Sequence, residues 1–194
     1  MKHFGTKTLE TKNLILRKIQ KNDYKTAFKN YCSDEDVTDY VLWEVHKNEE
    51  ETKELFSLWM NMYEEEDTYK WVIVYKENNE VIGMIDAFKK LMKYDTVEIG
   101  YCLGKKYWNN GIMTEALKEV IRFMFEECNA ETIYAEYLEN NPASGKVMKN
   151  VGMKYDGKLR SRILDRFNRR NDLISYSIIK KEYFKDKLVN SNNN

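Results

Sequence analysis

The residues with the clearest potential for chemistry lie in Glu98–Ala116, where a strand pattern, a glycine-containing turn and a helix pattern follow one another. Alternating residues over Thr96–Leu103 predict a strand, and apolar residues spaced three and four apart after Thr114 predict an amphipathic helix. Gly111 in the turn has no side chain to keep an anion away from the backbone. The first N–H groups of a helix lack partners and lie at the positive end of its dipole. The stretch therefore predicts a phosphate site.

Glu98 is the carboxylate whose place in this stretch favours catalysis. It lies two residues before Gly100, on the strand face opposite Val97 and Ile99. Partial withdrawal from water raises the pKa of a carboxylate, which suits a general base. Glu98 is therefore a candidate base and a candidate amine-binding residue. The alternative is an ordinary surface carboxylate that is paired with a lysine.

Two motifs resemble those of a known family. YWNNGIMTEA, residues 107–116, resembles the acetyl-CoA pyrophosphate loop of the GNAT acetyltransferases, in the form used by the ribosomal-protein alanine N-acetyltransferase branch. EIGYCL, residues 98–103, resembles the cofactor-holding strand of that branch. The resemblance extends from about Glu10 to Tyr183 and implies an acetyl-CoA-dependent N-acetyltransferase.

The resemblance implies two contacts with acetyl-CoA. The backbone of Tyr101, Cys102 and Leu103 would pair with the amide groups of pantetheine, as an added strand pairs with a sheet edge. Backbone N–H groups of the loop would hold the pyrophosphate, and the residues concerned are Trp108, Asn109, Asn110, Gly111, Ile112, Met113 and Thr114. The loop departs from the family at Asn109, where glycine is common, and at Met113, where glycine or alanine is common.

Asn141-Pro142-Ala143-Ser144 resembles the Asn-x-x-Ser entry to the helix behind the thioester in this family. The resemblance implies that Asn141 hydrogen-bonds pantetheine and that Ser144 approaches the sulfur as a candidate acid. The family often places a tyrosine acid at the position of Met148, which has no proton to donate. The departing thiolate is then protonated by Ser144, by water or by no group. Asn before Pro is also an ordinary helix start.

Trp43 and His46 are the candidate substrate-binding residues besides Glu98, because their segment borders the acceptor pocket in this family. An aromatic ring binds a cationic amine by cation–π contact, and histidine relays protons near neutral pH. The alternative is that both residues are structural. Cys102 has no neighbouring histidine in the sequence, so we predict a small packed residue and direct attack of the amine in a ternary complex.

The predicted acceptor is the N-terminal amine of a protein or a small amine, and the predicted enzyme is a monomer or a homodimer. A second class of function stays open, namely a module of the same fold that binds acyl-CoA or a partner without turnover. The departures at Asn109, Met113 and Met148 favour that alternative.

The composition excludes several other classes. Basic and acidic residues both number 32 among 194, so no net field favours nucleic acid or a membrane surface. No apolar run reaches the roughly 18 to 20 residues of a membrane span, and no apolar segment follows Met1 as in a signal peptide. Three scattered cysteines predict reduced thiols in the cytoplasm, and two histidines give little basis for a metal site. A basic patch near the end is interpreted as solvated hairpin charge, and the alternative is a surface that contacts RNA or the ribosome. Its members are Arg160, Arg162, Arg166, Arg169 and Arg170.

The elements that position these residues follow from periodicity and capping signals. Further strands are predicted at 14–19, 71–75, 80–88, 132–138, 154–165 and 171–179, and further helices after Asn22, Asn48 and Asn141. Residues 34–45 are expected to be irregular, and the apolar side of the helix after Asn48 to carry Leu55, Leu58, Trp59 and Met62. This order predicts an α/β fold, with residues 1–185 as one domain that has a mixed, mostly antiparallel central sheet and helices on both faces. Residues 186–194 are predicted to be a frayed tail.

Overall fold

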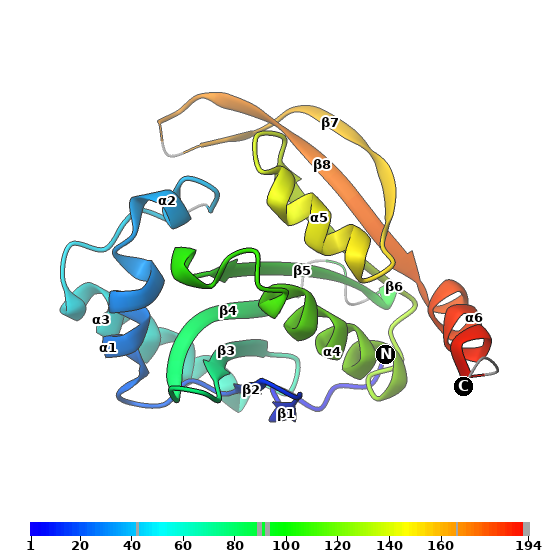
Figure 1. The fold of residues 1–194 in the computed structure, drawn as a ribbon, viewed down its shortest axis with the longest axis horizontal. Helices are drawn as coiled ribbons and strands as arrows, with labels where there is room; N and C mark the ends of the chain where they lie inside the picture. The colour runs from blue at the N-terminus through cyan, green and yellow to red at the C-terminus, as the bar shows by residue number, and fades with distance from the viewer. Residues whose placement is uncertain (42, 89–90, 92–93, 166, 192–194) are drawn as a thin grey trace.

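A single twisted sheet forms the centre of the molecule (Figure 1). The computed structural model describes residues 1–41, 43–88, 91, 94–165 and 167–191. Within them the sheet has the strand order β1-β2-β3-β4-β5-β6-β8-β7, and only the pair β5 and β6 is parallel. The strands are β1 (Leu9–Glu10), β2 (Leu14–Arg17), β3 (Tyr69–Tyr75), β4 (Glu80–Phe88), β5 (Thr96–Leu103), β6 (Thr132–Leu138), β7 (Lys154–Leu164) and β8 (Arg170–Ile179).

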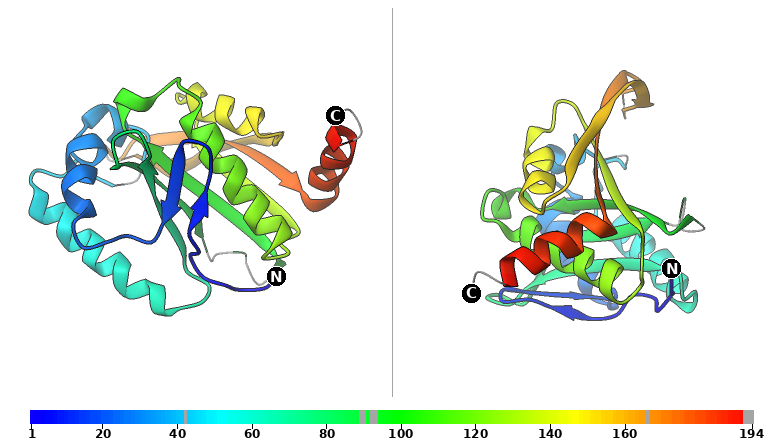
Figure 2. Two further views of the ribbon diagram at one scale, coloured as in Figure 1. Left: turned by 60° about the horizontal axis from the view of Figure 1, so that its bottom comes forward. Right: turned by 90° about the vertical axis from the view of Figure 1, so that its right-hand side faces the viewer.

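Helices cover both faces of this sheet (Figure 2). On one face α4 buries a continuous apolar stripe that includes Leu117, Val120 and Met124 against the odd-numbered side chains of β5. On the other face α1, the π-helical turn η1 and α3 pack against β3 and β4. The helices are α1 (Asp23–Ala27), η1 (Phe28–Cys32), α2 (Glu35–Thr38), α3 (Glu49–Asn61), α4 (Ile112–Glu126), α5 (Pro142–Asn150) and α6 (Lys180–Ser191), with short turns η2 (Met62–Glu64) and η4 (Lys105–Tyr107). The predicted fold class is confirmed.

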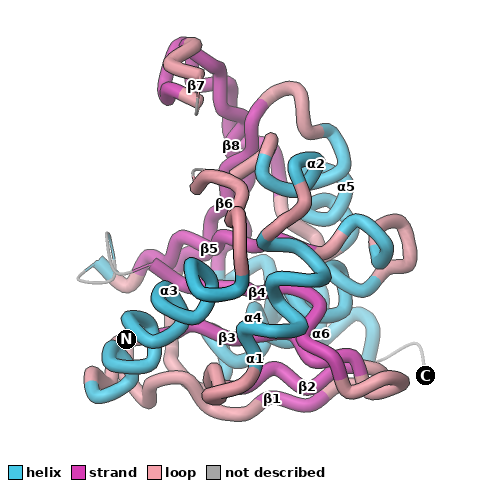
Figure 3. The backbone as a smooth tube through the Cα atoms, turned by 90° about the vertical axis from the view of Figure 1, so that its left-hand side faces the viewer, coloured by secondary structure: helices cyan, strands magenta, loops and turns pink. Residues whose placement is uncertain are grey.

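The sheet opens between β5 and β6. These strands pair at three positions, and the last pair is Glu98 with Tyr134. Beyond it β5 stays paired with β4 as far as Leu103, whereas β6 follows β8 as far as Leu138. The turn end of the β7 and β8 hairpin projects beyond the helices (Figure 3), whereas β8 contacts α5 and α6. A wedge-shaped gap therefore separates the two halves of the sheet.

The strands predicted from periodicity are present, with ends within a few residues of those expected. The segment expected to be irregular contains the short helix α2, because the side chain of Asp34 caps it by accepting a hydrogen bond from the Asp36 N–H at 2.9 Å. The capping signal at Asn48 is confirmed. Its side-chain oxygen accepts a hydrogen bond from the Glu51 N–H at 3.1 Å.

The predicted apolar side of α3 is wrong in part. Leu58 is 65% exposed and Met62 is 41% exposed, whereas Thr52 and Phe56 are buried. The buried side of the helix differs from the predicted one because Phe56 packs in the core between the helices α1 and α3 and the strands β3 and β4. Thr52 also faces inward, and its Oγ1 lies 2.7 Å from Nδ1 of His46. A pattern of apolar residues does not reveal that a polar residue such as Thr52 lies on the buried side.

The C-terminal end is helical where a tail was expected. Helix α6 crosses residue 185, the predicted boundary between domain and tail, and residues 192–194 lie outside the described residues. Tyr183 lies 5.0 Å from Phe125 between ring centroids and donates a hydrogen bond to Glu126, which also pairs with Lys187. These contacts with α4 hold α6 in place, and they are not visible in local sequence.

Gly104, directly after β5, gives the first testable prediction. An added Cβ would lie 2.4 Å from the carbonyl oxygen of Asn30 in η1, which is backbone and cannot rotate away. We expect Gly104→Ala to lower the free energy of unfolding by about 1–3 kcal/mol, measured by urea denaturation. Gly157→Ala is the control, because its Cβ would meet no atom within 4 Å. Equal losses in both variants would contradict this contact.

Candidate functional site

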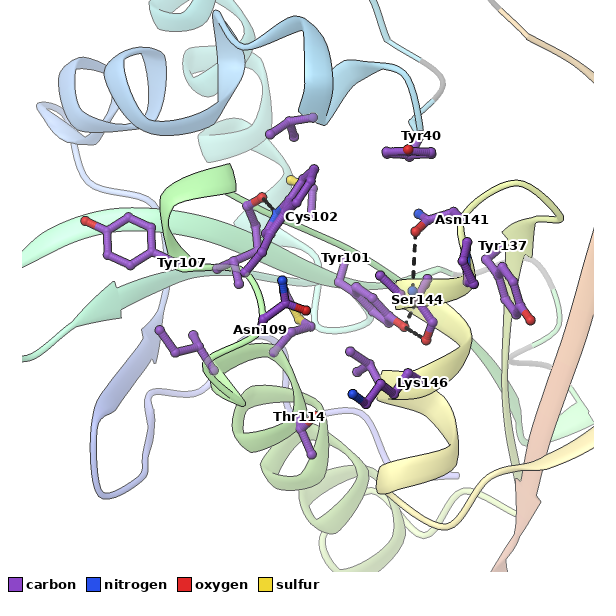
Figure 4. Close-up of a pocket in the computed structure, with 18 of the residues that line it drawn as sticks. Tyr40, Tyr101, Cys102, Tyr107, Asn109, Thr114, Tyr137, Asn141, Ser144 and Lys146 are labelled. Carbon is purple, nitrogen blue, oxygen red and sulfur yellow. Dashed lines mark hydrogen bonds between the residues drawn. The ribbon is translucent and has the colours of Figure 1, made fainter.

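A pocket of about 560 Å³ occupies the gap where β5 and β6 separate (Figure 4). It brings together most of the residues predicted to bind a cofactor. Those that line it are Tyr101, Cys102, Leu103, Trp108, Asn109, Gly111, Ile112, Met113, Thr114, Asn141 and Ser144. Asn110 is not among its lining residues. Strands β5 and β6, helices α2, α4 and α5 and the turn η4 contribute to one cavity of a size typical of ligand sites.

One end of the pocket is the N-terminus of α4. The helix begins at Ile112, two residues before the predicted start, and Gly111 precedes it with φ of 75°. No side chain caps this end, so the N–H groups of the first turn have no capping partner. An added Cβ on Gly111 would meet no atom within 4 Å, so space is open beside the backbone. Unpaired amides at the positive end of a 15-residue helix suit an anion.

The two departures from the family pattern have structural explanations. Asn109 has φ of 61°, the left-handed region that glycine adopts freely and asparagine tolerates better than most residues. Met113 is 5% exposed and packs in the main core. Neither substitution therefore requires the loss of the anion site.

The edge of β5 that faces the gap forms one wall. Gly104 N–H donates to the Ile82 carbonyl on β4 at 2.8 Å, so alternation directs the backbone groups of Tyr101 and Leu103 away from β4. They point toward the side from which β6 has separated. Trp108 Nε1 donates to the Leu103 carbonyl at 2.6 Å and satisfies one of these groups. The remaining groups form a short strand edge inside a pocket.

A hydroxyl group from β5 and one from α5 meet in the pocket. Ser144 Oγ donates to Tyr101 Oη at 2.9 Å, and that hydroxyl donates to the Ser144 carbonyl at 3.1 Å. Burial raises the pKa of Tyr101 above its usual range, so it stays protonated. Asn141 caps α5 by accepting a hydrogen bond from the Ser144 N–H at 3.3 Å. The sequence predicts a role for the hydroxyl of Ser144 but not for that of Tyr101.

Cys102 has the properties of a packed residue. Burial raises the pKa of its thiol to about 12, so the reactive thiolate is scarce at neutral pH. Burial also raises the pKa of Cys128 to about 11 and that of Cys32 beyond the usual range. All three thiols are free and buried. Thiolate chemistry therefore has no support at this site.

Glu98 lies at the edge of the gap and is not among the lining residues. Tyr134 donates a hydrogen bond to its Oε2 at 2.6 Å across the last pair of β5 and β6. Burial raises the pKa of Tyr134, and the nearby Glu98 and Glu136 add to that rise. The catalytic role of Glu98 stays a prediction.

Trp43 and His46 are not among the residues that line this pocket. Their ring centroids lie 5.5 Å apart, and His46 Nδ1 lies 2.7 Å from Thr52 Oγ1. Burial lowers the pKa of His46. The same segment instead contributes Tyr40 and Val41, and Figure 4 shows Tyr40 just above Asn141 in that view. The substrate-binding role of Trp43 and His46 stays a prediction.

Several lining residues were not predicted from the sequence, among them Tyr137, Glu136 and Lys146. Glu136 and Lys146 carry the charges among the described lining residues. Strand alternation directs the side chains of Glu136 and Tyr134 to the same face, but nothing in the local sequence shows that this face borders a gap. Lys146 and Asn150 are one helical turn apart, so the sequence shows that they share a face of the helix. It does not show which part of the protein that face borders.

A second cleft of about 360 Å³ shares Tyr40 and Val41 with the pocket. It continues to the turn between β7 and β8, where Phe167 and Arg169 line it. Arg166, which the sequence analysis placed in a basic patch, lies outside the described residues. Along residues 1–41, 43–88, 91, 94–165 and 167–191, no helix is long and apolar enough to cross a membrane. The same residues contain no group of three or more His, Cys, Asp or Glu side chains that could hold a metal ion.

Comparison with known proteins agrees with this geometry. The family profile described as "Acetyltransferase (GNAT) domain" matches residues 13–154. The uncharacterized N-acetyltransferase YoaA of Bacillus subtilis is 30% identical over 152 residues, which are 78% of this chain and 85% of YoaA. The ribosomal protein uS5-alanine N-acetyltransferase of Escherichia coli is 28% identical over 90 residues, 45% of this chain and 46% of that protein. The crystal structure of a GNAT-family acetyltransferase from Bacillus anthracis has a TM-score of 0.80 at 26% identity, covering 91% of this chain and 100% of that chain.

Proposed function

This chain belongs to the GNAT acetyltransferase family, and from that premise we propose that it transfers the acetyl group of acetyl-CoA directly to the nitrogen of a primary amine. The observation that carries the proposal is the gap between β5 and β6, with an uncapped helix N-terminus at one end and an open strand edge along it. Such a gap suits a long cofactor that has an anionic end, an amide-containing arm and a reactive thioester.

The cofactor would lie along β5. Its pyrophosphate would accept hydrogen bonds from the amides of Ile112, Met113 and Thr114. The pantetheine amides would pair with the backbone of Tyr101 and Leu103, which faces the gap. Four residues of strand span about 13 Å. A pantetheine arm that begins beside Leu103 and runs along β5 would therefore place its thioester near Ile99, at the end of the gap.

Acetyl transfer then requires little additional chemistry. An alkyl ammonium with a pKa near 10 must lose a proton before its nitrogen can attack. The oxyanion that forms on the carbonyl oxygen needs a hydrogen-bond donor, and the Tyr101 N–H faces the gap. The thiolate of coenzyme A leaves with a proton from solvent or from Ser144, which is hydrogen-bonded to Tyr101. The protonated thiols of the chain support direct attack rather than an acetyl-cysteine intermediate.

The acceptor would enter from the side of α2. Tyr40 and Val41 line both the pocket and the second cleft, so the two form a route from the surface. The related Escherichia coli enzyme acts on an alanine of a ribosomal protein, according to its name. We propose either a protein N-terminus or a small amine as the acceptor for this chain, in the cytoplasm, where its free thiols would stay reduced. The predicted oligomeric state, a monomer or a homodimer, stays a prediction.

A module that binds acyl-CoA without turnover is the second candidate. The observation that favours it is Met148, which is 1% exposed and packs in the core where many relatives carry a tyrosine acid. A thiol with a pKa near 8.5 is a good leaving group without strong acid catalysis, so this substitution does not remove the enzymatic proposal.

Release of free thiol from acetyl-CoA, measured with a panel of peptide N-termini, aminoglycosides and polyamines, separates these two functions. The proposal predicts amine-dependent thiol release and an acetylated product in equal amounts. Tight binding of acetyl-CoA without release for any amine would favour the binding module. Absence of both binding and release would contradict the cofactor site itself.

Lys146 gives a further prediction about this site. It is the cation among the described lining residues, and Figure 4 shows it directed from α5 toward α4. We expect Lys146→Met to weaken acetyl-CoA binding about three- to tenfold, because an exposed ion pair with a phosphate contributes about 1 kcal/mol. Isothermal titration calorimetry measures this loss.

Lys149→Met is the matched control, because Lys149 is exposed on the same helix but does not line the pocket. Repeating the titration with dephospho-CoA locates the contact. If Lys146 binds the 3′-phosphate, the loss disappears with dephospho-CoA, whereas a contact with the pyrophosphate preserves it. Equal affinities of wild type and Lys146→Met for both ligands would contradict the contact.

A further inference from the structure

Glu136 is the carboxylate among the described residues that line the pocket. The sequence predicts Glu98 as the base, but its carboxylate accepts a hydrogen bond from Tyr134 and does not line the cavity. An amine that enters the pocket would therefore meet the carboxylate of Glu136 before that of Glu98.

The register of the two strands locates Glu136 relative to the thioester. β5 and β6 are paired in parallel as far as Glu98 and Tyr134, and two residues further along each strand are Gly100 and Glu136. The strands have separated at that point, and both residues line the pocket. Glu136 thus lies across the gap from Gly100, at the end of the cavity opposite the helix N-terminus of α4.

Strand alternation also fixes the face on which Glu136 lies. Side chains two residues apart share a face, so Glu136 is on the same face as Tyr134 and Glu98. On β5 this face also carries Cys102, which packs with the core of α1 and α3. The opposite face carries Ile99 and packs with the core of α4. Glu136 therefore faces the side from which Tyr40 and Val41 border the pocket.

We propose that Glu136 binds the ammonium group of the acceptor and takes its proton, and that Glu98 supports the end of the gap through Tyr134. This assignment rests on the proposed acetyl transfer. The carboxylate lies on the acceptor side, where a cation is expected, and at the end of the pocket where the thioester is expected. Gly100 opposite has no side chain, and the ring of Phe88 lies where a side chain at that position would be.

The step balances as follows. The ammonium gives one proton to a carboxylate oxygen of Glu136, and the freed electron pair on nitrogen forms a bond with the carbonyl carbon. The carbon–sulfur bond breaks, and its electron pair leaves with the thiolate of coenzyme A. The attacking nitrogen loses a second proton as the amide forms. One of the two protons goes to the thiolate and the other to solvent, so amide, thiol and one proton are released.

The role of Glu98 follows from its hydrogen bond. Tyr134 holds Oε2 of Glu98 at 2.6 Å, across the last pair before the strands separate. Burial raises the pKa of the Tyr134 hydroxyl, and the charges of Glu98 and Glu136 act in the same direction. The phenol therefore stays protonated and remains a donor to Glu98, which fixes the point where the gap begins.

The test compares Glu136→Gln with Glu98→Gln, and Glu131→Gln serves as the control because Glu131 directly precedes the same strand. Glu131 is exposed, pairs with Lys180 and does not line the pocket. For an amine that the wild type acetylates, we expect Glu136→Gln to lower kcat about 100-fold near pH 7, within the range for loss of a general base. Glu98→Gln should lose less, and Glu131→Gln should match the wild type.

The pH profile separates a base from a structural residue. Without a base the variant can use only free amine, whose fraction rises about tenfold per pH unit below the amine pKa. The deficit of Glu136→Gln should therefore shrink by about that factor per unit as the pH rises toward about 10. This face also carries Tyr134, Glu98 and Cys102. Both proteins contain these residues, so they do not account for the difference.

Three results would overturn the assignment. Equal rates of Glu136→Gln and wild type would remove Glu136, as would a deficit that is the same at every pH. A pH-dependent deficit in Glu98→Gln alone would restore Glu98 as the base. Absence of thiol release by the wild type, by contrast, would contradict the proposed function before any variant is compared.

Folding is checked by the affinity of each variant for acetyl-CoA, which should stay within a few-fold of the wild type. If Glu136→Gln loses this affinity, Glu136→Asp is measured in its place. It retains a carboxylate, so its deficit should be smaller and independent of pH. A deficit in Glu136→Asp that shrinks as the pH rises would contradict proton transfer to this carboxylate.

Discussion

The short parallel ladder between β5 and β6 is the constraint on which the site depends. The strands pair at three positions and then follow different partners, β4 on one side and β8 on the other. Backbone groups of Tyr101 and Leu103 that would otherwise bond to β6 then face a cavity. Unpaired backbone groups are costly when buried, so a ligand with amides of its own is a fitting partner. The helix N-terminus of α4 and the start of α5 are brought to this gap by the turns that follow β5 and β6.

The features predictable from sequence are those that local geometry determines. The strand–glycine–helix order around Gly111 predicted an anion site, and the structure has an uncapped helix end with φ of 75° at that glycine. Asn141 and Asn48 were predicted as helix caps and are caps. Each depends on side chains within four residues of the helix start, which is the range over which capping acts.

The features that escaped prediction depend on contacts between distant segments. Leu58 matches an apolar stripe but is exposed, because Thr52 and Phe56 provide the buried side of α3. Glu136 borders the pocket only because β5 and β6 separate beside it, and no pattern within β6 shows where that happens. Trp43 and His46 belong to a segment that does approach the pocket, but Tyr40 and Val41 are the residues that line it. Helix α6 likewise depends on Glu126 and Phe125, which lie more than fifty residues earlier.

Amide hydrogen exchange, followed residue by residue by nuclear magnetic resonance, tests the cofactor placement most directly. On addition of acetyl-CoA, the account predicts slower exchange at the amides of Ile112, Met113 and Thr114 and at those of Tyr101 and Leu103. The amides of β7, on the far edge of the sheet, should exchange at unchanged rates. Saturating acetyl-CoA that leaves the first turn of α4 and the open edge of β5 unprotected would contradict the account.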